Sequence, residues 1–332
     1  MKKKGKEKGE RLGFRQMVFT FLLVTLSVSQ TLAAEEPYPN RPINIVINYA
    51  PGGVMDTHAK ILGDRLGELL GQPLVKVHKA GGGGTLGASF AARAKPDGYT
   101  LFTGTSVSLI YSPIVKKVDY TWEDFIPLGI YAKGAVRLYV KSDSSYKTLQ
   151  DFIDDAKKRP GQVKVSSYGR MTHADFVIEV FSRQAGLKLA HIPYKSTQEG
   201  ATALLGGHVD GAFIASSMGQ LETGAFKILA VADHERSKFL PEVKTFKELG
   251  YPIALPILYS LCVSSKAPKR AVDALSKGMQ GVYKRYGKEV EDALIRLEFL
   301  PYFLDSRKSI EEFKKDYELT YAIAKELNMV AK

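Results

Sequence analysis

The sequence predicts an α/β fold with two lobes, and three observations carry this prediction. A mostly apolar run, Ile43 to Tyr49, leads into Pro51-Gly52-Gly53 and the start of a helix. A second strand–glycine–helix junction, at Gly81–Gly87, follows thirty residues later. Helices that alternate with strands indicate parallel, doubly wound sheets. Further units of this kind begin at Thr148, and a length of 332 residues allows two domains.

The elements of the first part each have a local signal. The run 43–49 is too apolar for a half-exposed strand, so it is interpreted as a mostly buried one. Leucines spaced by four and three residues predict a helix from Asp56 to Leu70, which Gly71 ends. The remaining elements predicted here are strand 74–78, a helix of small residues through Ala94, and strand 100–103.

Capping boxes at Thr148 and Ser196 open two helices of the second part. Beyond Pro268, apolar residues at helical spacing predict a largely helical C-terminal region. The predicted strands are 136–140, 163–167, 191–194, 209–215, 226–232 and 258–264. The predicted helices are 148–158, 172–184, 196–205, a short one at 245–248, then 269–286, 288–298 and 308–327.

Two strand-like passages, near 136–143 and 257–265, are expected to connect the lobes. They place residues 38–138 and 260–332 in lobe 1, which is discontinuous, and residues 139–259 in lobe 2. A lobe inserted into another leaves a cleft between the two. Ligands of such sheets bind at the carboxyl ends of the strands, where the glycine loops lie.

Residues 1–34 are a predicted signal peptide. They carry seven of the 47 basic residues and two of the 35 acidic ones, so the net charge of +12 falls to +7 without them. The apolar run from Met17 to Ser29 is too short to span a bilayer comfortably, and small residues follow it, so cleavage is expected near Ala33 or Ala34. The alternatives are an uncleaved anchor and a start at Met17.

Composition narrows the range of functions. Acidic residues are interspersed with basic ones, and no basic stripe with interleaved aromatics occurs, so nucleic acid is not an expected partner. Mild basicity suits the attraction of a small anion. The one cysteine, Cys262, excludes an intramolecular disulfide and is expected to be a buried residue of a strand.

The motifs offer no catalytic residues. Gly82-x-Gly84-x-x-Gly87 matches the dinucleotide pattern formally, but no acidic residue ends a second strand about 20 positions later. There is no phosphate loop, nucleophile elbow or His-Glu-x-x-His motif, and the six histidines lack metal-ligand spacing. We therefore expect a protein that is not an enzyme and has neither metal nor cofactor.

What remains is anion binding by the backbone. Both glycine junctions are either tight turns or places where N–H groups face an anion. Asp56 is either the N-cap of its helix or a residue that orients a ligand, a water or the loop. Thr172 is expected to be an N-cap. Arg170 is either a solvated surface arginine or the side chain that pairs with a ligand carboxylate.

Several stretches together resemble one family, the periplasmic solute-binding proteins of tripartite tricarboxylate transporters, which includes the Bordetella-type uptake proteins. The resemblance covers nearly the whole mature chain. Its motifs are Tyr38-Pro-Asn-Arg-Pro-Ile43, Pro51-Gly-Gly with Asp56, Gly81-Gly-Gly-Gly-Thr-Leu-Gly87, Pro96-Asp-Gly-Tyr-Thr-Leu101, Tyr168-Gly169 with Thr172-His173, Ile192-Pro-Tyr-Lys195, Leu205-Gly-Gly-His-Val-Asp210, Leu229-Ala-Val231 with Arg236, Leu240-Pro-Glu-Val243, Thr245-Phe and Glu248-Leu-Gly250.

The resemblance implies a type II periplasmic-binding-protein (Venus flytrap) fold, in which each lobe is a doubly wound mixed sheet flanked by helices. It implies a monomer that captures a small carboxylate (a di- or tricarboxylate, an acidic amino acid or an aromatic carboxylate) for the membrane subunits of the transporter. The ligand-binding residues expected on this basis are Tyr49, Pro51, Gly52, Gly53, Val54, Met55, Asp56, Gly83, Gly84, Thr85, Thr105, Tyr168, Gly169, Arg170, Thr172, His173, Tyr194 and Ser216.

Two departures from the family pattern fall in these loops. Val54-Met55 and Arg170-Met171 replace residues that are usually small or polar in the family, so the ligand cannot be taken over from a relative. The alternatives to a transport receptor are a ligand sensor of the same fold that serves a membrane kinase, and an exported enzyme, for which no nucleophile–base pair is found.

Overall fold

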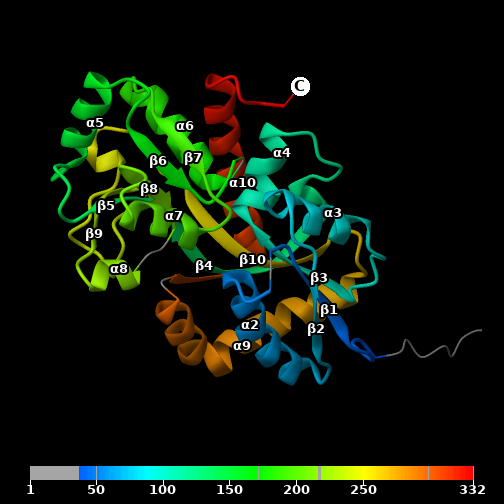
Figure 1. Ribbon diagram of the computed structural model, residues 1–332. Coiled ribbons are helices and arrows are strands. Elements are labelled where there is room, and N and C mark those ends of the chain that lie inside the picture. Colours follow the sequence, from blue (N-terminus) through cyan, green and yellow to red (C-terminus); the bar gives the residue numbers. More distant parts are fainter. Residues whose placement is uncertain (1–36, 50, 171, 216–217, 298, 332) are drawn as a thin grey trace, which may run out of the picture. The chain divides into compact units, whose positions relative to one another are not determined.

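Two mixed sheets flanked by helices form the described chain (Figure 1). The structure is a computed structural model that describes residues 37–49, 51–170, 172–215, 218–297 and 299–331. Both sheets belong to one unit, residues 41–332. The described part of the other unit is residues 37–40, with a cis peptide bond between Tyr38 and Pro39. The predicted signal peptide lies outside the described residues.

The first sheet has six strands in the order β11-β4-β10-β3-β1-β2. Strand β1 pairs in parallel with β2 and β3, as the βα units predict. Strand β10 runs antiparallel to β3 and β4, and β11 runs antiparallel to β4. The strands are β1 (Ile43–Ile47), β2 (Leu74–His78), β3 (Thr100–Thr105), β4 (Phe125–Ala135), β10 (Pro256–Ser264) and β11 (Leu300–Asp305).

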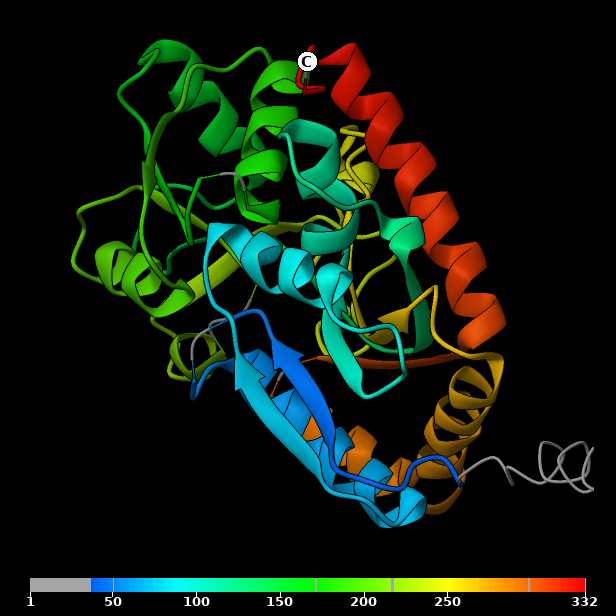
Figure 2. The ribbon, with the colours of Figure 1, turned by 90° about the vertical axis from the view of Figure 1, so that its right-hand side faces the viewer.

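Helices cover both faces of this sheet (Figures 1 and 2). One face carries α2 (Val54–Leu70) and α9 (Lys269–Arg296), which pack against each other. The other face carries α3 (Thr85–Arg93), η2 (Val107–Tyr111), α4 (Ser112–Val115) and α10 (Ser306–Glu326). The short η3 (Trp122–Asp124) precedes β4. Cys262 is fully buried in β10, which confirms that prediction.

The second sheet has five strands in the order β7-β6-β8-β5-β9. Strand β6 pairs in parallel with β7 and β8, whereas β5 runs antiparallel to β8 and β9. The strands are β5 (Arg137–Lys141), β6 (Lys164–Ser167), β7 (Ala190–Pro193), β8 (Gly211–Ile214) and β9 (Phe226–Val231). The helices are α5 (Leu149–Lys158), α6 (His173–Ala185), α7 (Thr197–Leu205), α8 (Met218–Glu222) and η4 (Lys247–Leu249).

The chain passes between the sheets twice. Strand β4 ends at Ala135 in the first sheet, and β5 begins at Arg137 in the second. The return runs beside this passage, because Ala232 N–H donates to Val136 O over 2.8 Å and Leu255 N–H donates to Ala232 O over 3.3 Å. The boundaries of the two predicted lobes remain a prediction.

Three parts of the secondary structure were predicted wrongly. The strand β4 was missed because Pro127 and two glycines break its apolar pattern, although most of it is buried. The strand β11, next to β4, was missed as well. The helices predicted at 269–286 and 288–298 are one helix, α9, because Gly287 inside it costs only about 1 kcal/mol in helix propensity.

The βα units pair in parallel as predicted, and antiparallel strands make both sheets mixed, as the family resemblance implied. The start of α2 differs from the prediction. Its N-cap is Gly53 without a side-chain hydrogen bond, so Asp56 lies in the first turn and is not the N-cap.

Candidate functional site

The carboxyl ends of the parallel strands of the first sheet lie level with one another. In the register of β1 and β3, Val46 pairs with Phe102. The residues just beyond β1, Asn48 and Tyr49, therefore lie beside the end of β3 at Thr105. Ligands of α/β sheets bind at this kind of edge.

The glycine loop over this edge has an unusual backbone. Gly81, Gly82, Gly83 and Gly84 all have positive φ, at 135°, 61°, 70° and 94°. A Cβ on Gly84 would lie 2.6 Å from Nδ2 of Asn48, so the loop rests directly on that side chain. Only glycine allows this conformation together with this approach.

The helix α3 begins immediately after the loop. It starts at Thr85 with Gly84 as the N-cap and has no side-chain cap, so no side chain takes up the positive end of its dipole. Thr85 Oγ1 donates to Gly82 O over 3.0 Å, and Lys116 Nζ donates to the same carbonyl over 2.5 Å. These two bonds hold the loop from outside.

Asn48 is a fully buried amide under the glycine loop. Its Oδ1 accepts from Thr103 Oγ1 over 3.1 Å. Its Nδ2 has no hydrogen-bond partner within the described part of the chain. A buried donor without a partner costs about 1–3 kcal/mol. The amide therefore offers an unused donor at the strand edge, next to the start of α3.

Tyr49 and Thr105 close the other side of this edge. Tyr49 Oη donates to Gly83 O over 3.4 Å. Burial raises the pKa of Tyr49 to about 12, against the opposing effect of a hydrogen bond with Thr105, so the phenol is neutral at physiological pH. Thr105 Oγ1 also lies 3.2 Å from Ser108 Oγ. Apart from Lys116, which donates to Gly82 O, the side chains described around the loop are thus neutral hydrogen-bonding groups.

Asp56 is tied to its own loop and to β2. Its carboxylate accepts from Lys76 Nζ over 2.9 Å, from Gly52 N–H over 3.0 Å and from His78 Nε2 over 2.9 Å. The hydrogen bonds from Lys76 and Gly52, in that order, lower the pKa of Asp56 to about 2. Asp56 therefore fixes the turn at Gly52, in keeping with the alternative in which it orients the loop.

The second sheet contributes the loop after β6. Thr172 is the N-cap of α6, as predicted, and accepts from Asp175 N–H over 3.4 Å. It also donates to Gly169 O over 2.8 Å, which holds the loop closed. His173 is buried and its Nε2 lies 2.7 Å from Leu255 O. Burial lowers the pKa of His173 to about 4, so its ring is neutral at physiological pH.

Three tyrosines, of which Tyr259 is buried and Tyr49 and Tyr168 are partly buried, relate the two strand edges to each other. Burial raises the pKa of Tyr168 well above its ordinary value, and the nearby phenols of Tyr259 and Tyr49 raise it further. Tyr168 follows β6 of the second sheet, Tyr49 follows β1 of the first, and Tyr259 pairs with Thr105 on β3. The phenols of the two strand edges are thus close enough to influence one another electrostatically.

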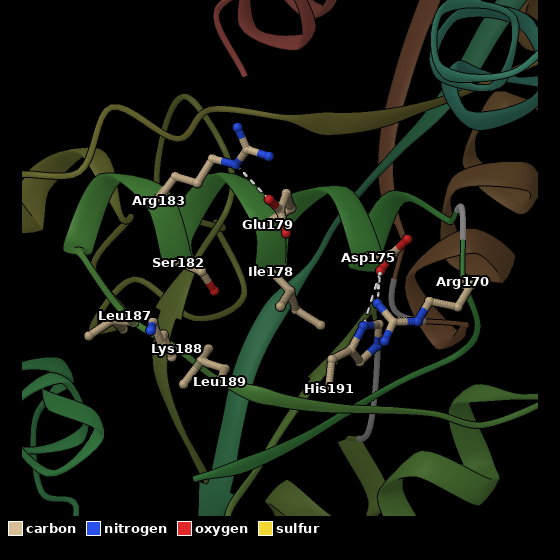
Figure 3. A pocket seen from close by; sticks show the side chains of 10 residues that line it. All are labelled: Arg170, Asp175, Ile178, Glu179, Ser182, Arg183, Leu187, Lys188, Leu189 and His191. Carbon is tan, nitrogen blue, oxygen red and sulfur yellow. Dashed lines mark hydrogen bonds and ion pairs between the residues drawn. The ribbon is translucent and has the colours of Figure 1, made fainter. Parts of the chain in front are cut away.

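Arg170 lies in the same loop, after β6, but its side chain pairs with an acid of α6. Its guanidinium pairs with Asp175 over 3.3 Å and its side chain is 61% exposed. The same carboxylate is 3.0 Å from His191 Nδ1. Figure 3 shows these groups at one end of a cavity of about 320 Å³ along α6, which Glu179 and Arg183 also line. Pairing of Arg170 with a ligand would require it to leave Asp175.

The remaining expected residues are distributed as follows. Pro51, Gly52 and Gly53 form the exposed turn before α2, and Met55 is buried in its first turn. Tyr194 follows β7 and packs against the core cluster around Tyr139 and Leu204. Ser216 and the side chain of Val54 lie outside the described residues. Within residues 37–331 as described, no group of three or more His, Cys, Asp or Glu side chains forms a metal site.

Sequence reasoning missed two residues of this region, Asn48 and Arg137. Asn48 was noted only as an interruption of an apolar run, yet an amide inside a buried strand end is itself a signal. Arg137 begins β5 among apolar residues and is only 7% exposed. A lone arginine in such a strand is a comparable signal.

The chain is similar to known proteins over most of its length. The sequence profile of a family described as "Tripartite tricarboxylate transporter family receptor" matches residues 59–328. A Cupriavidus necator protein named "UPF0065 protein in gbd 5'region" is 30% identical over 315 residues, which cover 92% of this chain and 93% of that protein. Protein BugT of Bordetella pertussis is 29% identical, over 76% of this chain and 79% of its own length.

Solved structures share the fold. One described as a periplasmic transporter has 30% identity and a TM-score of 0.78, over 89% of this chain and 99% of the other. A Rhodopseudomonas palustris protein with adipate also has a TM-score of 0.78 at 22% identity, over 89% of this chain and 100% of that one. The periplasmic-binding-protein fold expected from the sequence is therefore confirmed.

Proposed function

Because this chain belongs to the tripartite tricarboxylate transporter receptor family, we propose that it captures a small carboxylate and delivers it to the membrane subunits of such a transporter. The family fixes the general role, a solute-binding receptor. The carboxylate and the transporter partner are the specific parts of the proposal.

One observation carries the choice of a carboxylate: the unused donor of the buried Asn48 beside the start of α3. A carboxylate oxygen placed there accepts from Nδ2 and from the first N–H groups of the helix. Anions are favoured at helix N-termini by both the orphan N–H groups and the dipole. Hydrogen bonds to an ionised acceptor are roughly twice as strong as neutral ones.

The rest of this edge supports the same ligand chemistry. Asp56 accepts from the turn before α2, and its charge is already balanced by Lys76 and by the Gly52 N–H. The phenols of Tyr49 and Tyr168 are neutral donors, because burial raises their pKa values. The first carboxylate is thus bound by preorganised neutral groups, which need little rearrangement.

We place the mature protein in the periplasm, where such receptors act, after cleavage near Ala33 or Ala34. Of the helices in the described residues, none is long and apolar enough to cross a bilayer.

A thermal-shift screen tests the proposed function. The mature chain is heated with succinate, malate, adipate, citrate, glutamate or benzoate, and with neutral amides of the same acids as controls. At a concentration 100 times its dissociation constant, a ligand stabilises the folded state by about 2.7 kcal/mol. We expect one or more of the acids to raise Tm by several degrees and the amides to leave it unchanged. Equal shifts with acids and amides, or no shift with any anion, contradict the proposal, and so does turnover of a bound acid.

A further inference from the structure

Arg137 is a buried cation at the edge of the second sheet. The residue is 7% exposed, and its Nη1 donates to the carbonyl of Ala215. Its Nε is buried and has no hydrogen-bond partner among the residues that the structure describes. A backbone carbonyl thus accepts from Nη1 of the guanidinium, and the Nε–H is left without an acceptor among the described residues.

No described acid neutralises this charge. None of the carboxylates in the described ranges forms an ion pair with Arg137. By strand register the candidate acid is Asp233, two residues beyond Val231, which pairs with Arg137 on β9. Burial raises the pKa of Asp233, and the groups that oppose this rise are the His234 N–H, Lys133 and His234. An arginine buried without a counter-charge is costly, so such residues usually have an anionic partner.

The register of the second sheet places Arg137 at its ligand-binding edge. Arg137 opposes Ile214, the last residue of β8, because β5 and β8 are antiparallel. β8 and β6 are parallel, with Ser166 level with Ala212. The start of β5 therefore lies at the same edge as the carboxyl ends of β8 and β6, where the loop of Tyr168 begins.

The charge of Arg137 also reaches the first sheet. Burial raises the pKa of Tyr259 above its ordinary value, nearby Tyr49 adds to the rise, and the positive charge of Arg137 opposes it. Tyr259 is the residue of β10 that pairs with Thr105 at the end of β3. The guanidinium thus lies close enough to the Tyr259 hydroxyl to influence its ionisation.

We propose that Arg137 pairs with the second acidic group of an elongated dicarboxylate whose first carboxylate is bound at Asn48 and the start of α3. This inference rests on the proposed function and names its substrate class. A carboxylate would fit the planar guanidinium fork and accept from the unused Nε–H. The ligand would then span from the first sheet to the second.

The experiment compares two arginines of the second sheet. Arg137→Gln removes the buried charge, and Arg170→Gln removes the exposed one that pairs with Asp175. Each is titrated with the α,ω-dicarboxylates of four to eight carbons and with the monocarboxylates of the same chain lengths. At each chain length, the affinity for the dicarboxylate divided by that for the monocarboxylate measures recognition of the second acidic group. If Arg137 has only a structural role, its substitution does not change this ratio.

In the unsubstituted protein we expect at least one dicarboxylate to bind more tightly than the matching monocarboxylate. Arg137→Gln is expected to weaken that dicarboxylate by roughly 30-fold or more, since a buried charge pair loses one partner. The affinity for the monocarboxylate stays within about threefold. Arg170→Gln keeps the ratio of the unsubstituted protein. Arg137→Met, which fills similar volume without an unpaired polar group, gives the same loss and replaces Arg137→Gln if that variant does not fold.

Three outcomes are distinguishable. If neither kind of acid binds to the unsubstituted protein, the proposed function fails, and this inference fails with it. If both kinds bind equally well, or if the Arg137 variants keep the preference for dicarboxylates, this inference is wrong and the proposed function stands. If Arg170→Gln abolishes the preference and Arg137→Gln does not, the second acidic group binds at Arg170.

Discussion

The strand edges of the two sheets differ in how their charged side chains are paired. At the first edge Asn48, Tyr49 and Thr105 are neutral and Lys116 donates to the Gly82 carbonyl. The acid Asp56 is balanced by Lys76 of β2 and by the Gly52 N–H. At the second edge lie two arginines with opposite surroundings. Arg170 is exposed and has an acid partner, whereas Arg137 is buried and has none within the described residues.

This difference suggests a division of labour. Neutral donors and a helix dipole bind any carboxylate, because they interact only with the acid group itself. A buried guanidinium favours ligands that bring a second negative charge to it and disfavours those that leave it unpaired. Under the proposed function, the first edge provides general affinity for carboxylates and the second edge provides the choice among them.

Substitution of Asn48 tests the general part of this division and has the largest expected effect in the first sheet. Asn48→Leu removes the unused donor but keeps the branched shape of the side chain. Hydrogen bonds to charged groups contribute about 1.5–3 kcal/mol, so mono- and dicarboxylates should both bind roughly 10- to 150-fold more weakly. Calorimetric titration measures both affinities.

The stability of the same variant separates binding from folding. Asn48→Leu removes a donor that lacks a partner, and Thr103 Oγ1, which loses Asn48 Oδ1, can still donate to Val46 O. Tm without ligand should therefore change little. The control is Thr103→Val, which removes the bond to Asn48 Oδ1 but leaves Nδ2 in place, and it should bind carboxylates within a few-fold of the unsubstituted protein. Unchanged affinity in Asn48→Leu would exclude the amide from the site.

Substitution of Asp56 has a smaller expected effect, on the loop. Since the folded-state pKa of Asp56 is lowered from 3.8 to about 2, ionised Asp56 stabilises the fold above pH 3.8, and this stabilisation is lost as the pH falls toward 2. Asp56→Asn should therefore have a lower Tm than the unsubstituted protein at pH 7, and the difference should vanish toward pH 2. Affinity for all carboxylates should fall a few-fold alike.

The control for this prediction is Asp64→Asn, in the same helix. Asp64 is paired with Lys60 at the surface and is 62% exposed, so its loss should change Tm little at any pH. A difference between Asp56→Asn and the unsubstituted protein that persists at pH 2 would mean that the carboxylate does not act through its charge.

Local patterns predicted much of the fold because the signals were local. Capping by Thr148, Thr172 and Ser196 is observed as expected, and so is the end of α2 at Gly71. The strands β4 and β11 were not predictable in this way. Their positions depend on pairing with β10 and with each other, which are contacts between distant parts of the chain.

The site was predictable only in part for the same reason. The glycine loops are recognisable from their composition, and the family resemblance points to them. Whether a charged side chain is buried or paired depends on residues distant in the sequence, which no local pattern contains. From the sequence, Arg170 is expected to be accessible in a loop, whereas in the structure it forms an ion pair with Asp175. Arg137 looks like part of a strand, and its burial without an acid partner becomes visible only when β5 is placed beside β8.

A crystal structure of the protein with the dicarboxylate that raises Tm most tests the central claim most directly. We expect one carboxylate within hydrogen-bonding distance of Asn48 Nδ2 and the first N–H groups of α3, and the other at the guanidinium of Arg137. A ligand bound along α6 between Arg170 and Arg183, with both carboxylates away from Asn48 and Arg137, would contradict the account.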